Sequence, residues 1–319
     1  MGEIVRENLT TLSDAKASVR NGTLTREDYW RLVQGSISSA SGLSAILAES
    51  GSSITVSELG IILKYPITPT QSVKFFLDAE DTRSIGASIV AGGRYEPVLQ
   101  EALLKVSTQS KTFIDVGANV GFYSISVRAT NPTCNVIAFE CNPKVANLFI
   151  ENIEVNEIDN ITIYPLALSD KSEKAEFYVP AFTGSGGGSL RDLHPEEGES
   201  YKFTVDVMPL DSLSLEGIDL MKIDVEGAEL GVILGGLVAI KSFRPTIFIE
   251  LLRKWMKPFG SSPADVSDLL IGLGYLVFEV TDDEVIEVAE ITQVTQTTNY
   301  IFVHPSRPSH LSIIRGLTS

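Results

Sequence analysis

Acidic side chains follow directly after several apolar runs of this chain, where they can bind a small ligand or accept a proton. The first is Asp115, in the segment Thr-Phe-Ile-Asp-Val-Gly-Ala-Asn-Val-Gly-Phe-Tyr-Ser that begins at Thr112. Gly117 and Gly121 bracket Asn119, and glycine permits positive φ angles and close approach of a ligand to the backbone. A helix after this turn presents unpaired N–H groups and the positive end of its dipole. The segment therefore predicts a strand that ends in a binding turn for a small polar or charged ligand.

The glycine spacing disfavours a dinucleotide as that ligand. A G-x-G-x-x-G fingerprint starting at Gly117 requires glycine at positions 119 and 122, which hold Asn119 and Phe122. The spacing D-x-G-x-x-x-G is instead similar to the first motif of class I methyltransferases, which bind S-adenosylmethionine. A glycine turn that only joins a strand to a helix is the structural alternative.

A second acid, Glu140, ends the apolar run Val136 to Phe139, and Asn142-Pro143 then opens a helix. Because the second strand of a doubly wound sheet lies beside the first, this carboxylate can accept hydrogen bonds from both ribose hydroxyls of an adenosine. Nicotinamide enzymes use the same interaction, so Glu140 alone indicates adenosine and not a particular cofactor. Together with the glycine spacing it favours adenosylmethionine, and a helix cap or a solvated strand end is the alternative.

Charged residues alternate along the run from Asp219 to Glu229, at Lys222, Asp224 and Glu226. In an extended strand these three side chains share one face, and buried charges of this kind must pair with each other, with Glu250 or with a ligand. A carboxylate there can remove a hydroxyl proton as general base, or hold a divalent metal that acidifies the hydroxyl. We expect Asp224 to be the first candidate base, with Glu226 and Glu250 behind it. If a metal is bound, Asp224 and Glu250 are its candidate ligands, and an ion-pair network around Lys222 is the alternative.

Composition limits the partners of the chain. Its 41 acidic and 25 basic residues give a formal charge of -16, which argues against a nucleic acid because such affinity depends on Lys and Arg contacts to phosphate. Cys134 and Cys141 are too few for a disulfide framework or a zinc site. Residues 1–11 have no signal-peptide core and no apolar stretch has membrane-spanning length, so we expect a cytoplasmic protein. His194, His304 and His310 lack metal spacing, and we expect them at the surface.

Apolar runs alternating with helical segments predict a largely parallel sheet covered on both faces. The runs are Phe113–Val116, Val136–Phe139, Ile161–Leu168, Leu220–Val225 and Thr246–Ile249, and Tyr275–Val280 and Tyr300–Val303 close the sheet as an antiparallel pair. Between the third and fourth runs, an insertion is expected to form a β-hairpin from Ala175–Val179 and Lys202–Met208 around the glycine-rich loop 184–189. The fold class is therefore α/β, with a mostly parallel seven-stranded sheet and a β-hairpin insertion.

Several segments together resemble the FkbM-type methyltransferases. They are Phe113–Ser124, Ala138–Pro143, Ala167–Asp170 and Lys222–Glu229, with Gly93–Pro97 ahead of them. The resemblance implies a class I, Rossmann-like fold that uses S-adenosylmethionine and O-methylates a hydroxyl of a sugar, glycan or polyketide-like small molecule. An N- or carboxyl-methyltransferase, an NAD-dependent oxidoreductase and a non-catalytic adenosylmethionine-binding protein stay open as alternatives. The identity of the methyl acceptor, the dependence on a metal and the pairing with a second copy of the chain also stay open.

The resemblance also implies a domain division and a set of cofactor residues. It covers residues 73–305, beginning with a short hairpin over Val73–Ile89, while 1–72 is a small helical region serving as lid, dimer contact or substrate wall, and 306–319 is a tail. The residues implied around the methionine end are Asp115, Gly117, Ala118, Asn119 and Gly121. Those implied around the ribose and adenine are Glu140, Asn142 and the segment from Ala167 to Asp170, with Glu96 near the methionine or the substrate mouth.

Overall fold

A computed structural model describes most of the chain beyond residue 50. The described residues are 18, 23–25, 47–48, 50–58, 60–77, 85, 88–89, 94–180, 187–193, 200–292, 295 and 297–318. The chain divides into two compact units, 1–95 and 96–319, whereas the sequence analysis drew its boundary after residue 72. No helix in the described part of the chain combines the length and the hydrophobicity needed to cross a membrane.

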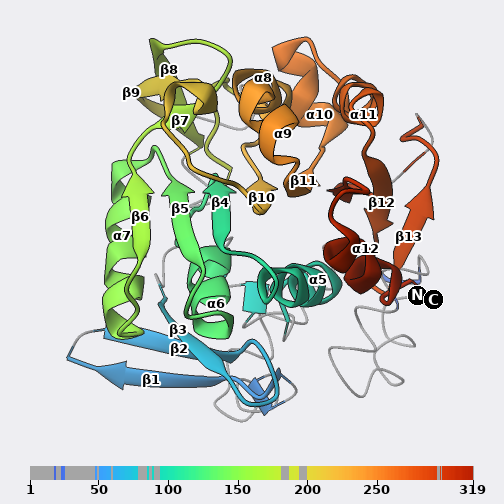
Figure 1. The fold of residues 1–319 in the computed structure, drawn as a ribbon. Coiled ribbons are helices and arrows are strands. Elements are labelled where there is room, and N and C mark those ends of the chain that lie inside the picture. The colour runs from blue at the N-terminus through green and yellow to red at the C-terminus, as the bar shows by residue number, and fades with distance from the viewer. Residues whose placement is uncertain are drawn as a thin grey trace. The chain divides into compact units, whose positions relative to one another are not determined.

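The first unit contains a three-stranded antiparallel sheet (Figure 1). Its strands are β1 (Ser53–Ser57), β2 (Gly60–Pro66) and β3 (Ser72–Phe76), arranged in chain order. Leu63 and Tyr65 of β2 are buried opposite Phe75 and Val73 of β3, the period-two burial expected of a strand with one covered face. The helical prediction for residues 1–72 is therefore wrong over β1 and β2. The first part of the hairpin predicted over Val73–Ile89 is β3, which pairs with β2, and most of the remainder of that predicted hairpin lies outside the described residues.

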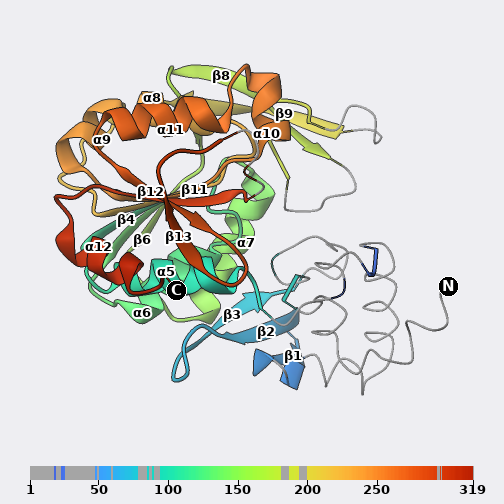
Figure 2. The same cartoon turned by 90° about the vertical axis from the view of Figure 1, so that its right-hand side faces the viewer.

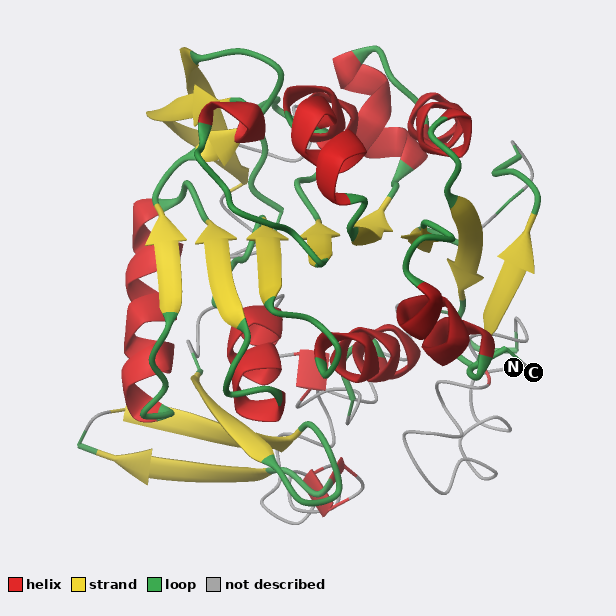
Figure 3. Ribbon diagram, viewed as in Figure 1, coloured by secondary structure: helices red, strands yellow, loops and turns green. Residues whose placement is uncertain are grey.

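The second unit is built on an eight-stranded sheet with the order β13-β12-β14-β11-β10-β4-β5-β6 (Figures 1 and 3). The parallel strands are β4 (Thr112–Val116), β5 (Asn135–Phe139), β6 (Ile161–Tyr164), β10 (Leu220–Ile223) and β11 (Thr246–Glu250). The antiparallel strands are β12 (Leu276–Val280), β14 (Asn299–Val303) and β13 (Val285–Val288). The predicted seven strands are thus present, and β13 extends the sheet by an eighth strand that the sequence analysis did not identify.

Helices cover both faces of this sheet, as predicted. Figure 2 shows α8 (Glu229–Gly235), α9 (Leu237–Phe243) and α11 (Pro263–Gly272) on one side, with α5 (Pro97–Ser107), α6 (Phe122–Thr130) and α12 (Pro308–Arg315) on the other. The remaining described helices are α7 (Pro143–Val155), the short α10 (Arg253–Met256), and the single turns η2 (Leu210–Ser212) and η3 (Lys257–Phe259).

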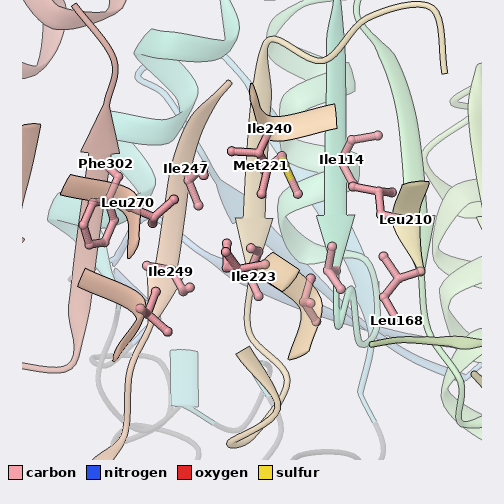
Figure 4. Close-up of a cluster of buried hydrophobic side chains, with 14 of the residues drawn as sticks. Ile114, Leu168, Leu210, Met221, Ile223, Ile240, Ile247, Ile249, Leu270 and Phe302 are labelled. Carbon is pink, nitrogen blue, oxygen red and sulfur yellow. The ribbon is translucent and has the colours of Figure 1, made fainter. Parts of the chain in front are cut away.

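Strand pleating sorts apolar and charged side chains onto opposite faces of the central strands. Ile114, Met221 and Ile247 lie in one buried cluster with Ile240 of α9 and Leu270 of α11 (Figure 4). Because side chains alternate along a strand, the intervening residues of β4, β10 and β11 point toward the face covered by α5 and α6. That face therefore receives the charged residues of the central strands.

The predicted β-hairpin insertion is confirmed. β8 (Glu173–Pro180) pairs antiparallel with β9 (Ser200–Met208), and β7 (Ala167–Leu168) adds to β9 as a third strand. The third predicted run, Ile161–Leu168, is split between β6 and β7 at Pro165, because proline cannot donate a ladder hydrogen bond. The inner face of the hairpin sheet buries apolar residues that pack against Cys141 and Ala167: Phe177, Val179, Val205 and Val207.

Two expectations about the C-terminal part are corrected. Residues 306–319, described above as a tail, contain α12, whose His310 and Ile314 are buried. His310 Nδ1 lies 2.8 Å from Thr246 Oγ1, so the surface prediction is wrong for this histidine, because it shares a covered helix face with Ile314. His304 is bonded to Ser306, and His194 lies outside the described residues. Cys134 and Cys141 are free thiols.

Arg307, just before α12, joins several segments at the amino-terminal edge of the sheet. Its guanidinium donates to the carbonyl oxygens of Ile218 at 2.9 Å, Phe243 at 2.8 Å and Arg244 at 3.2 Å, and it forms a short ion pair with Asp219. A single side chain thus satisfies three backbone acceptors and one carboxylate.

We expect Arg307→Met to lower the free energy of unfolding by roughly 2–4 kcal/mol, because it leaves those acceptors unpaired. The matched control is Arg315→Met, since the Arg315 pair with Glu287 is half exposed and screened by water, so its loss should change the stability little. Urea unfolding of both variants makes the comparison, and equal losses would contradict the assigned role.

Candidate active site

The carboxyl ends of four parallel strands bring the predicted site residues together. Asp115 lies in β4, Glu140 directly follows β5, Asp224 directly follows β10, and Glu250 ends β11. Lys222 of β10 pairs in register with Asp115 of β4, which places the two side chains on the same face of the sheet. This edge is where open α/β sheets bind their ligands.

Lys222 is the central cation of this site. Its side chain is 7% exposed, and its Nζ lies 2.7 Å from Asp224 Oδ2 and 4.9 Å from the centre of the Tyr123 ring. Burial opposes the charge on Lys222, but the carboxylates of Asp224, Glu96 and Asp115 outweigh it and raise the pKa of the lysine. The ion-pair network that the sequence left open around Lys222 is therefore present.

Glu96 reaches the same site from the start of α5. Its Oε2 accepts a hydrogen bond from Tyr123 Oη at 2.5 Å, and its Oε1 accepts one from Asn299 Nδ2 at 3.3 Å. Burial raises the pKa of Glu96, and the nearby Lys222 opposes that shift. Sequence reasoning identified neither Tyr123 nor Asn299. Tyr123 stands inside the glycine-turn motif, whereas Asn299 belongs to no motif and has no sequence signal.

Asp115 is buried below the glycine turn. Its Oδ2 accepts a hydrogen bond from Ser124 Oγ of α6 at 2.6 Å, and its side chain is otherwise removed from solvent. Burial raises the pKa of Asp115, while Lys222 opposes the shift. The acid therefore ties the end of β4 to the first turn of α6.

The turn after β4 folds back onto the end of β5. The backbone N–H groups of Gly117 and Ala118 both donate to the Phe139 carbonyl oxygen at 3.0 Å. Asn119 adopts a left-handed φ of 52°, and its Oδ1 accepts from the N–H of Val120 at 2.8 Å, a local bond that makes this conformation accessible to asparagine. Asn119 at a position where a dinucleotide fingerprint has glycine is thus compatible with the tight turn.

The two glycines of this turn are required by packing within the chain itself. Gly117 has φ 77°, and a Cβ there would lie 1.9 Å from the Asp224 carbonyl oxygen. Gly121 has φ 85°, and a Cβ there would lie 2.0 Å from the Phe149 ring of α7. The sequence analysis explained these glycines by positive φ angles and by ligand approach. The positive φ angles are confirmed, packing against Asp224 and Phe149 is an additional requirement for glycine, and ligand approach stays a prediction.

Glu140 connects the glycine turn to α7. Its Oε2 accepts from the N–H of Asn119 at 3.0 Å and its Oε1 from the N–H of Asn142 at 2.7 Å. Burial raises the pKa of Glu140 to about 7, against the opposing effect of these two donors. Asn142 caps α7 by accepting from the N–H of Lys144 at 3.1 Å. Each oxygen of Glu140 keeps acceptor capacity for a further donor such as a ribose hydroxyl.

The segment after β10 departs from the extended course expected for it. β10 ends at Ile223, and a turn follows in which Glu226 has φ 51° and Gly227 has φ 103°. The expectation that Glu226 continues the alternation of Lys222 and Asp224 along one strand is therefore wrong. Backbone conformation, and not strand pleating, sets the direction of the Glu226 side chain.

Three carboxyl groups near this turn hold their protons to unusually high pH. Burial, with the charge of Asp224 added, raises the pKa of Glu226 to about 8 and that of Glu250 well above its ordinary value. Burial also raises the pKa of Glu229 to about 7, although its Oε1 accepts from the N–H of Gly227 at 2.9 Å. Glu229, whose Oε2 is buried without a hydrogen bond, was absent from the predicted site residues.

The last two predicted cofactor residues lie beside the hairpin insertion. Ala167 belongs to β7 and is partly buried, whereas Asp170 is exposed and its Oδ1 accepts from Ser169 Oγ at 3.3 Å. Ser169 in turn packs closely on Gly235 of α8, where a Cβ would lie 1.9 Å from the Ser169 carbonyl oxygen. This packing fixes the segment next to the sheet, and its contact with an adenine stays a prediction.

Among the residues that the structure describes, no group of three or more His, Cys, Asp or Glu side chains is arranged to hold a metal ion. Within that part of the chain, no third side chain joins Asp224 and Glu250 to support a metal site. What the site does provide is a set of carboxyl groups around Lys222, which suits a cationic ligand and proton transfer. The set comprises Glu96, Asp115, Asp224, Glu226 and Glu250.

Comparison with known proteins identifies a family. The sequence model of the Methyltransferase FkbM domain matches residues 115–277. Methyltransferase 1 of Beauveria bassiana is 27% identical over 142 residues, 38% of this chain and 57% of that protein. The 2-O-methyltransferase NoeI of Sinorhizobium fredii is 29% identical over 138 residues, 39% of this chain and 56% of that protein. The chain thus spans somewhat over half the length of these curated relatives.

A solved structure of similar description also aligns with the chain. It is methyltransferase FkbM from Methylobacillus flagellatus, which is 16% identical and aligns over 71% of this chain and 62% of its own length, with a TM-score of 0.39.

The raised pKa values predict that the ligand-free protein loses stability as the pH rises. In the folded state Glu140 and Glu229 titrate near 7 and Glu226 near 8, against an ordinary value of 4.5. Their stabilising contribution is complete below pH 4.5 and is lost as the pH rises through 7 to 8, because the unfolded chain has then released protons that the folded chain keeps. Thermal unfolding between pH 5.5 and 8.5 measures this loss.

Glu229→Gln isolates one of these groups, because glutamine keeps the acceptor for Gly227 and cannot ionise. We expect the variant to recover up to about 3 kcal/mol relative to the wild type at pH 8.5 and about 1 kcal/mol at pH 5.5, because the carboxyl group of the unfolded wild type is already ionised at both pH values. Glu151→Gln, at an exposed position of α7, serves as the matched control. An identical pH dependence in Glu229→Gln and the wild type would contradict the assignment.

Proposed function

The chain belongs to the FkbM methyltransferase family, and from this premise we propose that it transfers the methyl group of S-adenosylmethionine to a hydroxyl oxygen of a sugar, glycan or polyketide-like small molecule. Its strand order and its helices on both faces of the sheet are those of a class I methyltransferase. The observation that carries the proposal is the carboxylate of Glu140, which stands beside the glycine turn after β4, while Lys222 and Asp224 lie at the end of β10 on the other side of β4.

The residues present fit such a cofactor. Glu140 retains acceptor capacity on both oxygens, as hydrogen bonding to two ribose hydroxyls requires. Asp115 and Glu96 supply negative charge close to Lys222, which suits the cationic centres of the methionine part. The glycine turn and Asn142 hold the backbone on which both acids depend.

We assign the role of general base to Asp224. When bound, S-adenosylmethionine would supply an electrophilic methyl group for the acceptor oxygen, with S-adenosylhomocysteine as the leaving product. The acceptor hydroxyl gives its proton to the Asp224 carboxylate, which Lys222 orients through their 2.7 Å contact. Burial raises the pKa of Glu226 to about 8 and that of Glu250 above its ordinary value, so we rank both behind Asp224 as bases.

Oxygen is the proposed acceptor atom for two reasons. The name of one relative, 2-O-methyltransferase NoeI, specifies transfer to oxygen, and the chain matches somewhat over half of that protein. A hydroxyl must also lose a proton during methylation, which gives a neighbouring carboxylate a defined task. Transfer to nitrogen or to a carboxylate is the alternative within the same class.

Glu140→Ala tests the cofactor assignment. We expect S-adenosylhomocysteine to bind more weakly by about 1–3 kcal/mol, roughly 5- to 150-fold, because a charge-assisted acceptor for the ribose is lost. Wild-type affinity should also fall as the pH drops below about 7, where Glu140 takes up a proton, and the variant should lack this dependence. Calorimetric titration, with Glu151→Ala as control, measures both effects.

If S-adenosylhomocysteine binds Glu140→Ala as tightly as the wild type, the ribose contact is wrong. A thermal-shift comparison separates the classes of enzyme, since a methyltransferase is stabilised by S-adenosylhomocysteine and not by NAD. Stabilisation by NAD alone would overturn the proposed function.

Asp224→Asn tests the base. Turnover, measured as S-adenosylhomocysteine release with the best acceptor from a panel of glycans and lactones, should fall at least about tenfold while affinity for S-adenosylhomocysteine stays within a few-fold. Asp206→Asn is the matched control, because Asp206 is an exposed acid paired with Lys174 on the hairpin. Unchanged turnover in Asp224→Asn would exclude it as the base.

A further inference from the structure

Ser189 links the hairpin insertion to the turn that carries Glu226. Its backbone exchanges two hydrogen bonds with Tyr178 of β8, at 2.8 Å and 3.0 Å, although Ser189 itself lies outside the strands. Its hydroxyl donates to the carbonyl oxygen of Glu226 at 2.8 Å. The residue is 1% exposed, so these bonds are made away from competing water.

The turn that receives this hydrogen bond is conformationally strained. Glu226, with φ 51°, and Gly227, with φ 103°, are the two central residues of a turn that closes from Val225 to Ala228. Two positive φ angles favour Gly, Asn or Asp at these positions, and a longer side chain there costs about 1–2 kcal/mol. A strained non-glycine residue persists only where its surroundings fix it, and Ser189 supplies one such contact.

A second contact involves a residue that packs against the same turn. The Arg191 guanidinium lies 5.6 Å from the centre of the Phe259 ring in η3. Phe259 and the Trp255 carbonyl oxygen back directly onto Gly227, where a Cβ would lie 2.9 Å and 2.3 Å from them. We call residues 187–193 the strap. The strap contacts the Glu226 turn through Ser189, and through Arg191 it contacts Phe259, which packs against Gly227 of that turn.

We propose that Ser189 is a positioning residue whose hydroxyl fixes the Glu226 turn, and with it the direction of the Glu226 carboxyl group, through the strap. The proposal rests on the proposed function in treating Glu226 as part of the catalytic site. It goes beyond that function because it assigns to the hairpin insertion a role in positioning one of the carboxyl groups around Lys222. Ser189 itself acts only through the Glu226 backbone.

The environment of Glu226 gives the strap a measurable consequence. The charged and titratable groups that influence its pKa are Lys222 and Asp224 of the β10 segment, Glu229 of α8, Glu250 of β11 and Lys254 of α10. Burial among them raises the pKa of Glu226 to about 8. If the turn relaxes, the carboxyl group gains access to water and its pKa should fall toward the ordinary range.

Carbon-13 NMR of glutamate carboxyl groups tests the proposal on the ligand-free full chain, with the Glu226 signal assigned by its loss in Glu226→Gln. Ser189→Ala should lower the titration midpoint of Glu226 by about one pH unit or more, and Ser189→Thr, which keeps a hydroxyl, should restore it. Arg191→Met, an exposed change that weakens the second contact, should shift the midpoint in the same direction by less.

Ser110→Ala is the matched control. Ser110 is also buried and donates its hydroxyl to a backbone carbonyl, that of Val106 at 3.0 Å, but it lies at the opposite edge of the sheet. An unmoved Glu226 midpoint in Ser189→Ala, or an equal shift in Ser110→Ala, would overturn the proposal. If Ser189→Ala fails to fold, an unmoved midpoint in Arg191→Met overturns it instead.

Binding of S-adenosylhomocysteine separates this proposal from the proposed function. Its affinity for Ser189→Ala should stay within a few-fold of wild type, because the strap does not contact the glycine turn or Glu140 in the described hydrogen bonds. Failure of the wild type to bind S-adenosylhomocysteine would count against the proposed function, whereas the NMR midpoint would still decide the role of Ser189.

Discussion

The ion pair between Lys222 and Asp224 is the interaction on which the carboxyl edge of the sheet depends. Removing an ionised carboxylate from water costs several kcal/mol unless it is paired, and Asp115, buried in the next strand, adds to that demand. Lys222 of β10 supplies this pairing charge, and its ammonium group lies over the Tyr123 ring. The Lys222 charge thereby lowers the free-energy cost of burying several carboxyl groups close together in the folded protein.

Two turns adapt the backbone around this ion pair. After β4, Gly117 leaves room for the Asp224 carbonyl, and Asn119 donates its N–H to Glu140, so the first three parallel strands of the site are tied together at their ends. After β10, the chain leaves the strand through a left-handed Glu226, which the strap residue Ser189 contacts through its hydroxyl. The conformational strain of the turns thus lies where ligands are expected.

Much of the architecture follows from local patterns. The seven predicted strands and the hairpin are present because apolar runs of strand length and their turn residues act over a few positions. The exceptions also have local physical reasons: Pro165 splits one run, and period-two burial of Leu63 and Tyr65 gives strands where helix was expected. His310 was misplaced because one polar residue on an apolar helix face has no distinctive pattern.

The sequence by itself determined the family, the order of the strands along the chain and the acids that end them, because motif spacing and hydrophobic periodicity are properties of neighbouring residues. Only the tertiary structure decided that Asn299 contacts Glu96, that Glu229 is buried, and that Ser189 contacts the Glu226 turn. These contacts join segments far apart in the chain. Burial and pairing, which set the charge of each acid, arise only when the sheet and the hairpin bring those segments together.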